Sequence, residues 1–91
     1  MVFLAVRDQQ TVGRRSSNSL VINDPSVSAD HVRVYRRFPG QVVLVEDLQS
    51  SNGTYRVYED RVTRLVPGVM YALPVGTLLN LTRNGPVVAL L

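Results

Sequence analysis

The sequence predicts an all-β protein, an antiparallel two-sheet β-sandwich. Its apolar residues either alternate with polar ones or gather in short β-branched runs, and neither pattern has the period of a helix. Glycine, proline, asparagine or aspartate interrupts these runs roughly every eight to twelve residues, as turns between short strands do. The chain has 91 residues. This length predicts a single domain over residues 1–91.

Ten segments have the composition of strands. In Val32–Arg36 we expect the apolar side chains on one face and the arginines on the other, as in a half-buried antiparallel strand. The other segments are short apolar or β-branched runs bounded by turn residues. In chain order, the expected strands are Val2–Val6, Thr11–Arg14, Ser19–Ile22, Val32–Arg36, Val42–Glu46, Tyr55–Tyr58, Val62–Leu65, Met70–Leu73, Leu78–Leu81 and Val87–Leu91.

Turn residues separate these strands. Asn23-Asp24-Pro25-Ser26 predicts a turn, because short polar side chains bond back to the backbone and proline fixes φ. Phe38-Pro39-Gly40 predicts a hairpin connection. The pairs Asn52-Gly53 and Asn84-Gly85 predict tight loops that need a positive φ.

The two ends of the chain are apolar. The first run, Val2–Val6, is too short for a signal-peptide core of about 7–15 apolar residues and for a membrane helix. We therefore expect an intracellular protein, in the nucleus or the cytoplasm, without a membrane partner. Because the chain starts on a strand and stops inside the run Val87–Leu91, we expect it to be the N-terminal module of a longer protein.

Charge and metal-ligating residues narrow the classes of partner. The net charge is +3 and all ten basic residues are arginine. Arginine forks suit phosphate recognition, but a GC-rich codon usage is the stronger explanation of the bias. The arginines form no block, so we expect no nucleic-acid partner. With no cysteine and one histidine, the sequence predicts neither a disulfide nor a metal site.

Three segments place polar residues in loops rather than on strand faces. They are Gly13-Arg14-Arg15, Ser26–His31 and Ser50–Thr54. Loops displayed by a rigid scaffold are where binding residues usually lie. An arginine fork, serine hydroxyls and an asparagine amide suit a phosphate group beside an extended peptide backbone.

The same segments carry a family resemblance. Gly13-Arg14, Asn18, Asn23–His31 and Asp47–Thr54 follow one another at separations that resemble the signature of the forkhead-associated (FHA) domain. This family is among the arginine-using readers of phosphorylated motifs. The resemblance covers nearly the whole chain. It implies an eleven-stranded β-sandwich whose loops at one end bind phosphothreonine peptides.

The resemblance also implies a role for individual residues. Arg14 would make the main charge-assisted bond to the phosphate, and Ser28 would donate its hydroxyl to the same group. Ser51 would contribute near the phosphate, and Asn52 would hold the peptide backbone beside the phosphothreonine. Arg15 is a candidate for a further contact. The residues that would shape the loops without touching the ligand are Gly13, His31 and Gly53.

Departures from the family pattern leave an alternative open. Ala29 stands where the family commonly has arginine or another polar residue, and Asp30 adds a negative charge. Tyr55–Tyr58 replaces a second Asn-Gly pair, and Gly76-Thr77 replaces a Gly-Asp pair. The expected partner is a phosphothreonine-containing protein. The alternative is a scaffold module that assembles without reading phosphate.

Catalysis is not expected. Ser28, His31 and Asp24 could suggest a catalytic triad, but no nucleophile elbow and no second acid–base site accompany them. The sequence therefore predicts no catalytic residue, no enzyme activity and no cofactor. It does not indicate the identity of the partner or the oligomeric state.

Overall fold

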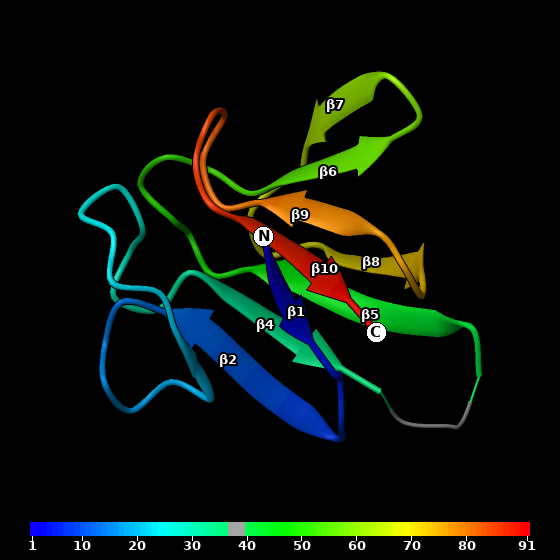
Figure 1. The fold of residues 1–91 in the computed structure, drawn as a ribbon, viewed down its shortest axis with the longest axis horizontal. Helices are drawn as coiled ribbons and strands as arrows, with labels where there is room; N and C mark the ends of the chain where they lie inside the picture. Colours follow the sequence, from blue (N-terminus) through cyan, green and yellow to red (C-terminus); the bar gives the residue numbers. More distant parts are fainter. Residues whose placement is uncertain (37–39) are drawn as a thin grey trace.

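The computed structural model describes residues 1–36 and 40–91, and the all-β fold is confirmed (Figure 1). These residues contain ten strands and no helix, so none of them forms a helix that could cross a membrane. Each strand overlaps a segment predicted to be one, although β2 begins two residues before the predicted Thr11. In chain order they are β1 (Val2–Leu4), β2 (Gln9–Gly13), β3 (Leu20–Val21), β4 (Val32–Tyr35), β5 (Val42–Asp47), β6 (Tyr55–Tyr58), β7 (Arg61–Arg64), β8 (Met70–Pro74), β9 (Leu78–Asn80) and β10 (Val87–Leu90).

The strands form two five-stranded sheets. Sheet A has the order β1-β10-β9-β6-β7, and sheet B has the order β3-β2-β4-β5-β8. Most neighbouring strands are antiparallel, but β1 with β10 and β2 with β3 are parallel. The predicted two-sheet β-sandwich is therefore confirmed, with these two parallel pairs among its antiparallel ones. Local patterns do not reveal that the first strand pairs with the last, or that the loop after β2 returns the chain to run alongside it.

The space between the sheets is filled mainly by valine and leucine. Val32 and Val34 of β4 face this core and are fully buried. Tyr35 does not share their face, because residues 33 and 35 project to the same side of a strand. Arg33 Nη1 donates to the Tyr35 hydroxyl at 3.3 Å on that side. The predicted separation of apolar side chains from arginines is wrong for Tyr35.

Two of the predicted turns are confirmed and one needs correction. In the turn 23–26, Asp24 Oδ1 accepts the Ser26 N–H at 2.9 Å and the Ser26 hydroxyl at 2.6 Å. Gly53 has the expected positive φ of 86°. Gly85 does not have a positive φ. It is needed for space instead, because a Cβ there would collide with the side chain of Thr82.

The predicted hairpin Phe38-Pro39-Gly40 falls largely on residues 37–39, which lie outside the described residues. The strands on its two sides, β4 and β5, pair antiparallel, with Tyr35 opposite Leu44. At the other end of the sandwich, the loops after β2, β3 and β5 gather beside the β9–β10 loop (left and upper left in Figure 1). These loops include all of the predicted binding residues.

Candidate functional site

Backbone and side-chain hydrogen bonds bring the three predicted loops together. The Arg14 N–H donates to the Ser28 carbonyl at 3.0 Å. From the third loop, the Ser51 N–H donates to the Ser28 hydroxyl oxygen at 2.9 Å, and Asn52 Nδ2 donates to the Ser26 carbonyl at 2.8 Å. The segment 26–28 therefore connects Arg14 on one side to Ser51 and Asn52 on the other.

Arg14 directly follows β2, and its side chain is exposed. Its Nε donates to the Val27 carbonyl at 3.1 Å, which fixes the direction of the guanidinium group. Within the described residues, the two terminal nitrogens of that group form no hydrogen bond or ion pair. Arg14 thus presents a fork of donors that is anchored at one edge and open to a ligand at the other.

Ser28 and Ser51 contribute in different ways. Because the Ser28 oxygen accepts the Ser51 N–H, the hydroxyl hydrogen of Ser28 remains available to donate. Ser51 makes this contact through its backbone, and its side chain is exposed. A donor hydroxyl is what an anionic oxygen requires, so Ser28 is suited to contact a phosphate.

Asn52 is an exposed residue whose amide is held by one bond. Its Nδ2 is bound to the Ser26 carbonyl, which leaves Oδ1 to accept a backbone N–H from a peptide. The following residue, Gly53, has φ 86°, and a Cβ there would lie 2.8 Å from Arg64 Nε. Glycine is therefore required at this corner for its positive φ, since the exposed Arg64 side chain could move away from a Cβ.

Gly13 allows the closest approach between two of the loops. A Cβ at this position would overlap the Ala29 carbonyl oxygen and lie 2.8 Å from Asn18 Nδ2. Asn18 itself is buried, and its Nδ2 donates to the Arg15 carbonyl at 2.9 Å and the Ala29 carbonyl at 2.7 Å. Sequence reasoning placed Asn18 in the signature without a role. The structure shows that it fastens the Arg14 loop to residue 29.

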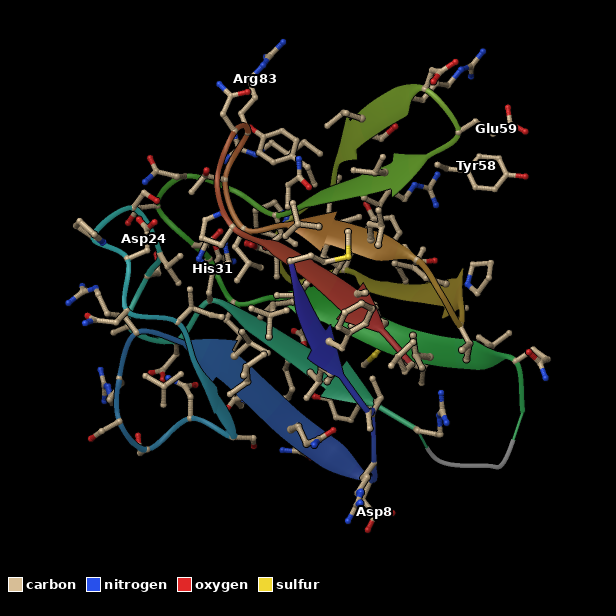
Figure 2. All side chains as sticks on the ribbon, in the orientation of Figure 1. Asp8, Asp24, His31, Tyr58, Glu59 and Arg83 are labelled. Carbon is tan, nitrogen blue, oxygen red and sulfur yellow. The ribbon has the colours of Figure 1, made fainter. Side chains whose placement is uncertain are left out.

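His31 is fully buried between the second and third loops (Figure 2). Its Nδ1 accepts the Ser28 N–H at 3.1 Å, and its Nε2 lies 2.8 Å from the Gly53 carbonyl oxygen. A carbonyl can only accept, so the ring is the neutral tautomer with hydrogen on Nε2. Burial lowers the pKa of His31, although the Gly53 bond and the Asp47 charge oppose this effect. His31 therefore has the loop-shaping geometry, and it does not contact the Ser28 hydroxyl as a triad base would.

Asp47, at the end of β5, holds the third loop by accepting hydrogen bonds from its residues. This fully buried carboxylate accepts the Ser50 hydroxyl at 2.5 Å, the Ser50 N–H at 3.0 Å and the Thr54 hydroxyl at 2.6 Å. Asp47 was quoted in the signature but given no role. The acidic residue followed by Ser50 and Thr54 was the signal that could have indicated it, because buried carboxylates need several donors.

Ala29 departs from the residue type that is common in the family, but this change does not separate the second loop from the Arg14 loop. The Ala29 carbonyl accepts both the Arg15 N–H at 3.0 Å and the Asn18 amide, so the backbone of residue 29 holds the loops whatever its side chain. Arg15 Nη2 lies 3.6 Å from Asp30 Oδ2, with both side chains largely exposed. Such an exposed pair is weak, but it balances the Asp30 charge beside the site.

A shallow hollow of about 450 Å³ continues from Asn52 and Ser26 towards the β9–β10 loop. Its far wall is made by Thr82, Arg83, Asn84 and Gly85. Sequence reasoning missed this wall, since nothing local to Asn84-Gly85 indicates that it lies beside Asn52. In the described part of the chain, no three metal-ligating side chains gather around a common point.

Comparison with known proteins supplies a family and a set of similar folds. The family model of the FHA domain matches residues 10–82. No match was found among curated proteins. Among solved structures, the MEK1 FHA domain in complex with a phosphothreonine peptide of HOP1 is 26% identical. The match covers 81% of this chain and 72% of that one, with a TM-score of 0.68.

Two further FHA structures are similar to this chain. The FHA domain of the CT664 protein from Chlamydia trachomatis is 25% identical over 87% of this chain and 72% of that one, with a TM-score of 0.68. A structure described as an analysis of phosphothreonine-dependent FHA domain interactions is 25% identical over 82% of this chain and 69% of that one, with a TM-score of 0.60.

Proposed function

Since the chain belongs to the FHA domain family, we propose that its loops bind a phosphothreonine residue in a partner protein. Solved FHA domains of similar fold include one in complex with a phosphothreonine peptide and one described by phosphothreonine-dependent interactions. The module would recruit a phosphorylated partner. We expect no catalytic step, and an intracellular location stays a prediction.

One observation carries this proposal: segment 26–28 holds Arg14, Ser51 and Asn52 in place by hydrogen bonds while their ligand-binding atoms stay free. Arg14 would bind the phosphate with its terminal guanidinium nitrogens. The Ser28 hydroxyl would donate to the same group. Asn52 would use its free Oδ1 to accept a backbone N–H of the peptide.

The charges support a phosphorylated ligand over an unphosphorylated one. A phosphothreonine carries about −1.5 to −2 charges at neutral pH and three strong acceptor oxygens. Arg14 and the Ser28 hydroxyl offer donors to such a group, and Asp30 is already paired with Arg15. A charge-assisted hydrogen bond contributes roughly 1.5–3 kcal/mol. The phosphate should therefore account for much of the affinity.

The alternative of a scaffold that assembles without reading phosphate is not favoured. It was motivated by Ala29 and by the changed segment Tyr55–Tyr58. Ala29 serves the loops through its backbone, and Tyr55–Tyr58 forms a regular strand, β6. Neither departure removes one of the four proposed binding residues.

The deciding experiment is a titration of the 91-residue chain with one partner peptide in two forms. A phosphopeptide-library screen supplies the sequence, and calorimetry then compares the phosphothreonine form with the unphosphorylated form. We expect binding of the first to be at least about tenfold tighter, and to be weakened by at least about tenfold in Arg14→Ala. Equal affinity for the two forms would contradict the proposal.

A further inference from the structure

The outer face of sheet A carries a row of apolar side chains across all five strands. Directly paired residues project to the same face of a sheet, and the next row, through Val88 and Leu79, faces the core. The outer row therefore points away from the sandwich. Its members, in spatial order, are Phe3, Ala89, Leu78, Val57 and Val62.

This row is accessible at both of its ends. Phe3 is 64% exposed on β1, and Val62 is 52% exposed on β7. Between them, Val57 and Leu78 are half-buried and the small Ala89 is buried. In Figure 1, β1, β10 and β9 lie in front of sheet B, and none of the described segments crosses over them. A solvated sheet face normally carries polar side chains at these positions.

The β6–β7 hairpin carries polar side chains on its inner side, where a core-facing strand normally carries apolar ones. Arg56 pairs with Leu79 and with Thr63, so Arg56 and Thr63 project to the inner side of sheet A. There they line a hollow of about 380 Å³ together with Leu73 of sheet B. The hairpin thus turns Arg56 and Thr63 inwards and its two valines outwards, which is the pattern of a strand pair whose outer face is covered.

The charges at the edges of this face indicate what covers it. Arg64 lies over the Tyr55 ring, with its Cζ 5.9 Å from the ring centroid, two residues to one side of the apolar row. Glu59 and Asp60 form the turn two residues to the other side of the row (Figure 2 labels Glu59). At its β6–β7 edge, the face therefore has a positive side and a negative side, with the apolar row midway between them.

We propose that this face binds the same face of a second copy of the chain. A twofold axis that lies along the row stacks the row on itself and reverses the strand direction. Because the charged residues are equally spaced about the row, this axis places Arg64 of one copy opposite Glu59 and Asp60 of the other. The four proposed binding residues, Arg14, Ser28, Ser51 and Asn52, are not part of this face, so this inference does not depend on the phosphothreonine proposal.

The size of the face sets the expected strength. Five strands about 4.8 Å apart and four residues at about 3.4 Å each give a face of about 24 by 14 Å. Stable complexes bury about 800 Å² on each partner, so this face is small. We expect a reversible dimer with a dissociation constant on the order of 0.1 mM.

Sedimentation equilibrium of the 91-residue chain, at concentrations up to about 1 mM, measures this association. The double variant Phe3→Lys and Val62→Lys should weaken it at least tenfold, since two ammonium groups would face the partner. Val42→Lys is the matched control, because Val42 is also a valine, 50% exposed, on β5 of sheet B. It should leave the dissociation constant unchanged. Thermal unfolding checks that each variant is folded.

A charge reversal tests the orientation of the two copies. Glu59→Arg with Asp60→Arg should weaken the dimer, and adding Arg64→Glu should restore it. A chain that stays monomeric up to about 1 mM would overturn the proposal and leave the face to a flanking segment or to another protein. A dimer that resists the Phe3 and Val62 changes, or a reversal that fails to restore it, would also overturn the proposed arrangement.

Discussion

The Ser28 hydroxyl oxygen accepts the backbone N–H of Ser51 at 2.9 Å, so these two serines of the proposed site are held differently, Ser28 by its side chain and Ser51 by its backbone. Ser28→Ala removes both this acceptor and the donor proposed for the phosphate. Ser51→Ala keeps the backbone bond. We expect Ser28→Ala to weaken phosphothreonine-peptide binding about tenfold or more and Ser51→Ala by less than about threefold. Calorimetry with one peptide compares them, and a larger loss in Ser51→Ala would contradict the proposed roles.

Arg14 should contribute most to binding. Arg14→Ala should weaken phosphothreonine-peptide binding by at least about tenfold and leave the free energy of unfolding nearly unchanged, since the side chain is exposed. Arg14→Lys should recover only part of the loss, because an ammonium group lacks the fork that Val27 holds through Nε. Arg7→Ala is the control, an exposed arginine before β2, at the opposite end of that strand. Equal losses in Arg7→Ala and Arg14→Ala would indicate a general charge effect.

Most of the fold was predictable from local patterns. Each strand follows from alternation or a short β-branched run, as Val32 and Val34 illustrate, and turns follow from residues such as Asp24. The pairing of β1 with β10 was not predictable, since it joins the two ends of the chain in parallel. Gly85 was assigned to the wrong cause, because its neighbour Thr82 fills the space that a side chain would need.

In the candidate site, too, some features were predictable from the sequence and others were not. Arg14, Ser28, Ser51 and Asn52 were named from motif spacing, and the structure places them around one segment. The supporting contacts depend on three-dimensional proximity, so their functions could not be read from spacing. Asn18 reaches residue 29, and Asp47 binds two later side chains. Arg83 lies beside Asn52 only because the β9–β10 loop folds back onto that end of the sandwich.

Gly13 offers a test of the close contact between loops. Gly13→Ala would push a methyl group into the Ala29 carbonyl and the Asn18 amide, so the backbone must shift. We expect the free energy of unfolding to fall by about 1–3 kcal/mol. Urea unfolding measures the change. Gly40→Ala is the matched control, because nothing lies within 4 Å of a Cβ at Gly40. A Gly13→Ala variant as stable as Gly40→Ala would show that the loops do not pack as described.

Asp47 should be essential for the third loop, although it is too deeply buried to touch a ligand. Asp47→Ala leaves the Ser50 and Thr54 hydroxyls and the Ser50 N–H without their acceptor. We expect at least about 2 kcal/mol of lost stability. Hydrogen exchange should also show weaker protection of residues 50–54. Asp8→Ala, an exposed carboxylate just before β2, should change neither measurement. Unaltered exchange in Asp47→Ala would contradict this role.

His31 predicts how stability depends on pH. Burial lowers the pKa of its imidazole below the ordinary value of 6.5, and it is the only histidine in the chain. Below about pH 6.5 the unfolded chain therefore takes up a proton that the folded chain resists, so the free energy of unfolding should fall as the pH decreases. Urea unfolding at about pH 7.5 and about pH 5.5 measures the difference. A proton on Nδ1 would also displace the Ser28 N–H, so the loops should open together with this loss. NMR can measure the pKa of His31 in the folded chain. A pKa at or above the ordinary value of 6.5 would exclude this explanation.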